Sequence, residues 1–175
     1  MHQVLLLGAM VAAVSTTSVG QRLPRIEARA FDGRQLVLPE SATGSITLVG
    51  LGYKRESQDD LSSWLLQFGK EYRPEDGFQA YEIPMMGKRI PGVLRGIINT
   101  AMRNVIPRDK RRWFAPYYGD IDAYSRQLGI TDREKVHMLL LDRTGAVRWR
   151  TSGRADSSRL SELRSEITRL LAEEK

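Results

Sequence analysis

The most constraining feature of the sequence is an apolar run, ITLVGLG at 46–52, that is followed at once by a charged turn and an amphipathic segment. An uninterrupted run rich in β-branched residues is typical of a central strand buried on both faces. Apolar residues then recur at helical spacing from Leu61 to Tyr72, which predicts a helix packed on a sheet. We expect Ser57 to cap this helix, with Asp60 completing a capping-box-like pair.

Further segments extend this strand–turn–helix unit. Strands are predicted at 34–39 and 78–84, after a polar lead-in at 22–33. Helices are predicted at 90–107, at 120–130 with Asp120 as cap and Gly129 as end, and from about 156–158 onward.

Residues 136–153 predict a β-hairpin. Its turn ends at Gly145, which suits a positive φ, and its return strand is expected to place Val147, Trp149 and Thr151 on one face. Parallel strands joined by a helix, then an antiparallel hairpin and a closing helix, are typical of the thioredoxin topology. The predicted fold class is therefore α/β and thioredoxin-like: a central mixed sheet with a C-terminal β-hairpin, flanking helices and a helical basic insert.

The chain contains no cysteine and only two histidines, of which only His137 lies in the body of the sequence. This composition excludes disulfides, thiol catalysis and cysteine-bound zinc within the chain. We expect His137 to be a neutral, hydrogen-bonded residue on one sheet face. No catalytic residue, metal site or cofactor is predicted.

The first twenty residues resemble a secretory signal peptide. The apolar run at 4–14 is shorter than a membrane-spanning helix needs, and Ser18 and Gly20 are small residues suited to cleavage after Gly20. An uncleaved membrane anchor is the first alternative, and a misassigned start is the second. We therefore expect residues 1–20 to be a signal peptide or anchor, 21–175 to form the thioredoxin-like domain, and the protein to be periplasmic or otherwise extracytoplasmic, with tethering to the inner membrane as an option.

The positive charge of the chain is concentrated at 88–126, where nine basic residues face three acidic ones. Within this basic amphipathic insert, Arg95, Asn99 and Arg103 cluster opposite a broad apolar helix face. Three interpretations stay open: nucleic-acid binding, contact with a membrane surface or client, and an ordinary insert packed on the domain. Nucleic acid is the least favoured partner, because an exported protein seldom meets it.

A family resemblance follows from IPRDKRRWFAPYYGDIDAYSRQLGI and VHMLLLDRTGAVRWRTSGRA. Over about residues 45–170 the chain resembles the mitochondrial F-type ATP synthase assembly factor family, which has a thioredoxin-like fold. The matching positions are Ile106-Pro107, Tyr118-Gly119, Leu128-Gly129-Ile130, Asp142, Arg148-Trp149 and Ser152-Gly153. The chain departs from the family at His137-Met138, where a Gly-Tyr pair is usual, and in its bacterial-style N-terminus.

The resemblance implies a chaperone for a membrane subunit of the proton channel, with no redox or hydrolytic activity. It also implies that the turn at 52–58 lies where redox members of the fold keep their cysteines. We therefore expect a non-redox binding protein, an accessory or assembly factor for a membrane complex such as ATP synthase, whose partner is a membrane protein subunit or the membrane surface. The alternative is an oxidoreductase relative that uses a non-cysteine site or a partner's thiol.

The candidate partner-binding residues come from the turn, the basic insert and the return strand of the hairpin. They are Tyr53, Lys54, Arg55, Arg95, Arg103, Arg108, Lys110, Arg111, Arg112, Arg148 and Trp149. Ser57 could act as a nucleophile or cap the helix, and we expect the capping role because only His137 could serve as its base.

Overall fold

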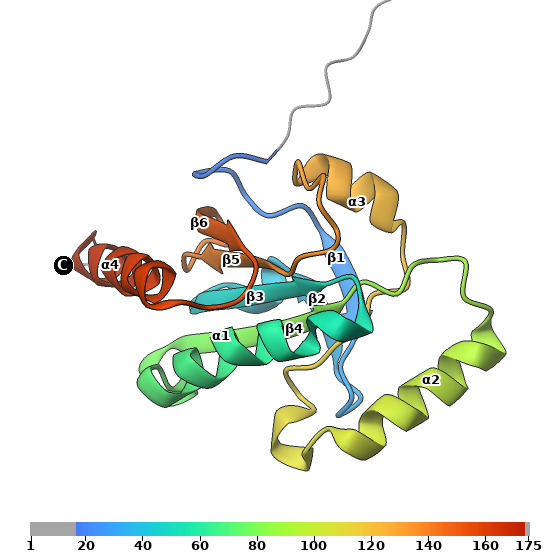
Figure 1. Cartoon of the computed structure of the whole chain (residues 1–175). Helices are drawn as coiled ribbons and strands as arrows, with labels where there is room; N and C mark the ends of the chain where they lie inside the picture. Colours follow the sequence, from blue (N-terminus) through green and yellow to red (C-terminus); the bar gives the residue numbers. More distant parts are fainter. Residues whose placement is uncertain (1–16, 174–175) are drawn as a thin grey trace, which may run out of the picture.

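The structure, a computed structural model, describes residues 17–173. Its strands are β1 (Ile26–Arg29), β2 (Gln35–Leu38), β3 (Ile46–Gly52), β4 (Phe78–Pro84), β5 (His137–Leu141) and β6 (Val147–Ser152). Its α-helices are α1 (Gln58–Glu71), α2 (Gly92–Val105), α3 (Ile121–Gln127) and α4 (Ser157–Glu173) (Figure 1).

The main sheet has the strand order β4-β3-β5-β6. β3 is parallel to β4 and antiparallel to β5, which in turn is antiparallel to β6. Every residue of β3 is buried, as the apolar run predicts for a central strand. The predicted mixed sheet with a C-terminal hairpin is therefore confirmed.

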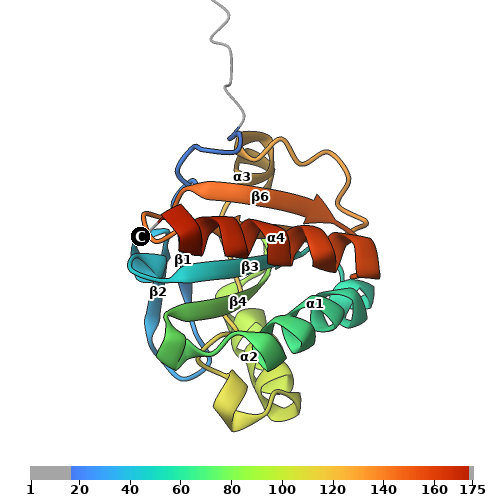
Figure 2. The same ribbon diagram turned by 90° about the vertical axis from the view of Figure 1, so that its left-hand side faces the viewer.

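Two apolar cores lie on the two faces of this sheet. α1 and α4 cover one face, where Trp64 and Ile167 are buried, and α3 with the β1–β2 hairpin covers the other, where Leu38 and Tyr124 are buried (Figure 2). α1 packs closely on β3 because Gly50 and Gly52 leave room for the Leu61 side chain. A Cβ at Gly50 would lie 2.6 Å from Leu61 Cδ2.

β1 was not predicted, since residues 22–33 read as a polar lead-in. β1 pairs with β2 in a separate two-stranded sheet, and its burial alternates, with Ile26 and Ala28 inside and Glu27 and Arg29 outside. A four-residue alternation with two charges is a weak pattern, and it becomes a strand because β2 supplies its partner.

A β-bulge between Leu140 and Leu141 changes the predicted faces of β6. Val147 is opposite Leu141 and belongs to the core under α3, whereas Trp149 is opposite Leu140 and belongs to the core under α4. The prediction that Val147 and Trp149 share a face is therefore wrong, because the extra residue in the strand reverses the alternation.

The predicted signal segment lies mostly outside the described residues, including the whole apolar run at 4–14. Residues 17–20 are described, and they contact the domain: the Thr17 amide donates to the Gln127 carbonyl at 2.6 Å and the Gly20 amide to the Val147 carbonyl at 2.6 Å. Cleavage after Gly20 stays a prediction. Within residues 17–173, no helix has the length and apolar character needed to cross a bilayer.

Candidate functional site

The turn between β3 and α1 lies at the end of the sheet where β3 and β4 both finish. It contains a short 3-10 turn, Arg55–Ser57, that runs directly into α1. Ser57 is buried in a right-handed helical conformation and makes no side-chain capping bond. Ser57 is therefore the N-cap residue of α1, as predicted, but the 3-10 turn holds it in a helical conformation and its side chain makes no capping bond. The capping box with Asp60 is not formed, because the Ser57 amide donates to the Lys54 carbonyl.

Tyr53 is half-buried in this turn and joins three elements. Its hydroxyl lies 2.9 Å from the Ser125 hydroxyl on α3, and its ring meets the His137 ring edge-on with centroids 6.2 Å apart. The Arg133 guanidinium lies 5.7 Å from the ring centroid. Burial raises the pKa of the Tyr53 phenol, so the group stays protonated at neutral pH.

His137 is held as a neutral ring, as predicted for a hydrogen-bonded histidine. Its Nε2 lies 2.6 Å from the Asp132 carbonyl oxygen, and burial lowers the pKa of the imidazole. No hydrogen bond joins His137 to Ser57 in the described part of the chain. Ser57 is therefore not activated by a histidine, and Tyr53 and His137 make their polar contacts within the chain.

The other two candidate residues of the turn reach solvent. Lys54 forms an ion pair with Glu134 on the loop before β5, and Arg55 is exposed. The Glu134 hydrogen bond raises the pKa of the Lys54 amine. Among residues 17–173 no cluster of histidine and carboxylate side chains could hold a metal ion. Chemically, the turn offers charged and aromatic contacts.

Glu82, at the same end of the sheet, was not predicted as a site residue. Its carboxylate accepts a hydrogen bond from Gln58 Nε2 at 2.7 Å, at the start of α1. Burial raises the pKa of the Glu82 carboxyl to about 7, while the Gln58 bond and the charge of Lys110 lower it. A strand pattern that alternates polar and apolar residues does not distinguish this half-buried carboxylate from an exposed one.

The last part of the basic insert pairs with β4 at the edge of the main sheet. Residues 113–117 run parallel to β4, with the Glu82 amide donating to the Trp113 carbonyl at 2.9 Å and the Tyr117 amide to the Pro84 carbonyl at 2.8 Å. The Met85 amide donates to the Gly52 carbonyl at 2.8 Å. The turn and the end of the basic insert therefore lie at the same end of the sheet.

The helix of the basic insert, α2, is oriented with its polar side toward the domain. Arg95 lies over the Tyr118 ring at 4.9 Å, Asn99 Oδ1 accepts a hydrogen bond from the Tyr118 hydroxyl at 2.6 Å, and Arg103 lies over the Phe31 ring at 5.4 Å. No residue of α2 is buried, and Figure 1 shows the helix standing apart from the layers around the sheet. Its apolar side is therefore left outside.

The exposed apolar side of α2 is large. Val93, Leu94, Ile97 and Val105 are 81%, 48%, 62% and 80% exposed. A soluble helix normally buries its apolar stripe and exposes its charges. We call these four residues the outer face of α2. The interpretation of 88–126 as an ordinary insert packed on the domain stays open, since Ile98 and Met102 of α2 are half-buried while the outer face is exposed.

The cations of the basic insert divide into two groups. Arg95 donates to the carbonyls of Ile90 and Lys88, and Arg111 donates to those of Ile106 and Arg103, so both hold the ends of α2 in place. The remaining candidates beyond α2 are exposed, namely Arg108, Lys110 and Arg112. Arg112 lies over the Trp113 ring at 4.3 Å, while Arg108 and Lys110 reach solvent.

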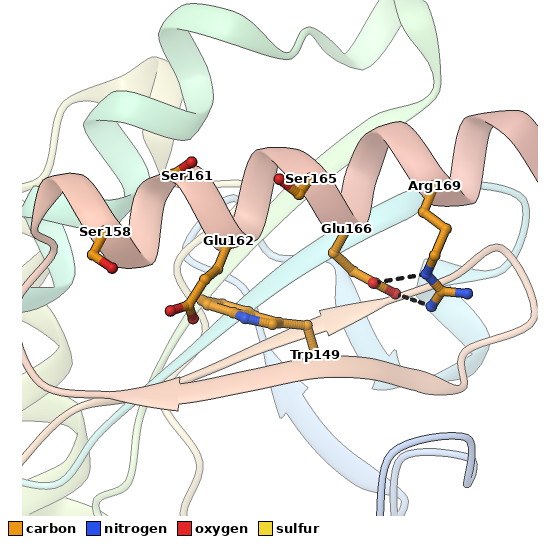
Figure 3. A pocket seen from close by; sticks show the side chains of 7 residues that line it. All are labelled: Trp149, Ser158, Ser161, Glu162, Ser165, Glu166 and Arg169. Atoms are coloured by element: carbon orange, nitrogen blue, oxygen red, sulfur yellow. Dashed lines mark hydrogen bonds and ion pairs between the residues drawn. The ribbon is translucent and has the colours of Figure 1, made fainter.

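Arg148 and Trp149 lie elsewhere, on β6 at the opposite edge of the sheet. Arg148 pairs with Asp142 at 3.0 Å and with Glu173 of α4 at 2.8 Å, and Trp149 packs on Trp64 with ring centroids 5.7 Å apart. Trp149 also forms the floor of a shallow hollow against α4, lined further by Ser158, Ser161, Glu162, Ser165, Glu166 and Arg169 (Figure 3). The structure therefore does not bring Arg148 and Trp149 together with the other candidate residues.

Solved structures with the same arrangement identify the fold. A protein assigned as the thiol:disulfide interchange protein DsbE from Chlorobium tepidum aligns with a TM-score of 0.60 at 16% identity, covering 89% of this chain and 99% of the other. The fold is thioredoxin-like. BsSco, a member of the Sco family of cytochrome c oxidase assembly proteins, aligns with a TM-score of 0.57 at 12% identity over 87% of this chain and 97% of the other.

An exposed lipoprotein thioredoxin from Streptococcus pneumoniae shares the fold, with a TM-score of 0.53 at 10% identity over 82% of this chain and 99% of the other. No protein-family model matches the chain, and no curated protein matches it. At these identities the thioredoxin-like neighbours establish the fold of this chain, and its function has to be argued from its own surface.

Proposed function

We propose that this chain is a non-redox thioredoxin-fold protein that acts by binding, as an accessory or assembly factor for a membrane protein complex such as ATP synthase. The observation that carries the proposal is the outer face of α2, which leaves aliphatic side chains in solvent beside exposed cations. An exposed apolar patch rimmed by polar residues is typical of an interaction surface.

The state of the turn at 52–58 supports binding over chemistry. The chain has no cysteine to react there, and the hydroxyl of Tyr53 is already bonded to Ser125. Lys54 and Arg55 reach solvent at the same end of the molecule as the basic insert. The turn is therefore suited to contribute charged contacts to a surface centred on α2.

The ATP synthase subunit as client comes from the family resemblance, and the extracytoplasmic location from the signal-like N-terminus. Two thioredoxin-like neighbours have names that fit this setting, the exposed lipoprotein thioredoxin and the Sco-type assembly protein. BsSco illustrates that the fold occurs in an assembly protein of a respiratory complex.

Site-specific crosslinking in intact membranes tests the proposal. A photoreactive residue replaces Arg55 in one variant and Ile97 in a second, and a third carries it at Ser165, an exposed residue of α4, as the matched control. We expect both Arg55 and Ile97 variants to capture a membrane protein that the Ser165 variant does not. Recovery of no membrane protein from either variant would contradict the proposal.

The alternative, an oxidoreductase relative that works on a partner's thiol, has one observation in its favour: several thioredoxin-like neighbours are named as thiol:disulfide proteins. A disulfide and peroxide turnover assay on the purified protein distinguishes the two. Binding without chemistry predicts turnover equal to buffer, and turnover above buffer would favour the alternative.

A further inference from the structure

We propose that the outer face of α2 rests on the surface of an anionic lipid bilayer. This inference rests on the proposed function and names the chemistry that its main surface recognises. α2 would lie in the plane of the interface. Its 14 residues measure about 21 Å along the axis, which is too short to cross a bilayer, and only one side of the helix is apolar.

The first argument is that the domain itself cannot cover the outer face. Arg95, Asn99 and Arg103 tie the opposite side of α2 to Tyr118 and Phe31, so the helix is fixed with its apolar side outward. Turning α2 over would lose these contacts. The exposure is therefore set by the fold, and no other part of residues 17–173 covers this face.

The second argument is charge complementarity. Exposed cations lie before and after α2 in the chain: Arg89 precedes it, and Arg108, Lys110 and Arg112 follow it. An aliphatic helix face flanked by Lys and Arg is the pattern of helices bound at anionic headgroups, where each cation near the surface adds to the attraction.

The third argument is the shape of the outer face. Its large side chains are aliphatic and extend from Val93 to Val105. A hollow on this face is shallow and is lined by Val93, Gly96, Ile97, Thr100, Ala101 and Asn104. Protein partners usually place aromatic or arginine anchors in deep pockets. A broad aliphatic surface without such a pocket suits acyl chains better.

The absence of cysteine allows a direct test, since one introduced cysteine is the only labelling site. The full chain carries an environment-sensitive fluorophore at Ile97→Cys or, as control, at Ser165→Cys. Each is mixed with vesicles of phosphatidylcholine plus phosphatidylglycerol or of phosphatidylcholine alone. We expect a blue shift at position 97 with anionic vesicles, a weaker one with neutral vesicles, and none at position 165. If only the N-terminal apolar run inserted into the vesicles, the label at position 97 should behave like the control label at position 165.

The combined variant R108Q, K110Q, R112Q tests the role of charge. At about fivefold per cation, its affinity for anionic vesicles should fall by up to about a hundredfold. An unchanged spectrum at position 97 with anionic vesicles, or equal shifts at 97 and 165, would overturn the inference. A blue shift at position 97 that appears only with native membranes would indicate that the outer face binds a membrane protein. That result would contradict the inference and remain consistent with the proposed function. Vesicle binding without any crosslinked membrane protein would support the inference and contradict the proposed function.

Discussion

The turn at 52–58 and helix α2 lie near the same end of the molecule and differ in how their side chains are satisfied. In the turn, Tyr53 and Lys54 find partners in Ser125 and Glu134 from distant parts of the chain. In α2, Arg95 and Asn99 contact Tyr118 of the domain, and the side chains of the outer face are exposed to water. The hydroxyl and the amine in the turn are therefore already partnered within the chain, whereas the outer face of α2, near the same end of the molecule, has no such partner among residues 17–173.

The largest expected difference between the two regions is in packing. Leu61, just inside α1, is buried against Gly50 and Gly52, so Leu61→Ala should lower the free energy of unfolding by about 2–5 kcal/mol. Ile97→Ala on α2 should change it by no more than about 0.5 kcal/mol, since the side chain is exposed. Urea denaturation of both variants measures this. Similar losses would mean that α2 is packed after all.

The second difference concerns Glu82 beside the turn. The pKa of its carboxyl is about 7 in the folded state against 4.5 as the ordinary value, so the folded protein binds more protons between these pH values. Stability contributed by this group should fall as pH rises from about 4.5 to 7 and stay level above. Glu82→Gln keeps the hydrogen bond to Gln58. At pH 8 its free energy of unfolding should exceed that of the parent protein by up to about 3 kcal/mol.

The matched measurement for Glu82 is at acidic pH. At about pH 4 the parent carboxyl is protonated in the folded state and mostly protonated in the unfolded state, so the parent and Glu82→Gln should have nearly equal free energies of unfolding. Parallel denaturation curves at pH 4 and pH 8 give both values. A constant difference at the two pH values would show that the pKa of Glu82 is not raised by burial.

The smallest difference compares two tyrosine hydroxyls. Tyr53→Phe leaves the buried Ser125 hydroxyl without its partner and should destabilise the protein by about 1–2 kcal/mol. Tyr118→Phe removes a bond to Asn99 at the surface, where water substitutes, and should have an effect of about 0.5 kcal/mol or less. Thermal unfolding of the two variants gives the ranking, and a larger effect for Tyr118 would reverse the comparison.

The sequence predicts the parts of the fold that follow from local patterns. β3, α1 and the turn at Gly145 were predicted from periodicity and turn residues, and the Asp120 cap of α3 is confirmed by its 2.9 Å bond to the Ala123 amide. β1, the β6 bulge and the conformation of Ser57 were missed because each depends on a partner strand or on the preceding turn rather than on its own residues.

The candidate site was predicted less well than the fold. The basic, amphipathic character of 88–126 is visible in the sequence, but the direction in which α2 faces is set by Tyr118 and Phe31, which lie outside the helix. Glu82 was missed because its burial depends on the approach of α1 and the end of the basic insert. Arg148 and Trp149 were grouped with the other candidates although β6 lies across the sheet from β4.

The central claim is that the outer face of α2 is open in the isolated protein and covered at the membrane. The reaction rate of a single cysteine with a water-soluble maleimide measures this directly, using Ile97→Cys and Ser165→Cys in the cysteine-free chain. The account predicts fast labelling at both positions in the purified protein and protection at position 97 alone once native membranes are added. Equal labelling at position 97 with and without membranes would contradict it.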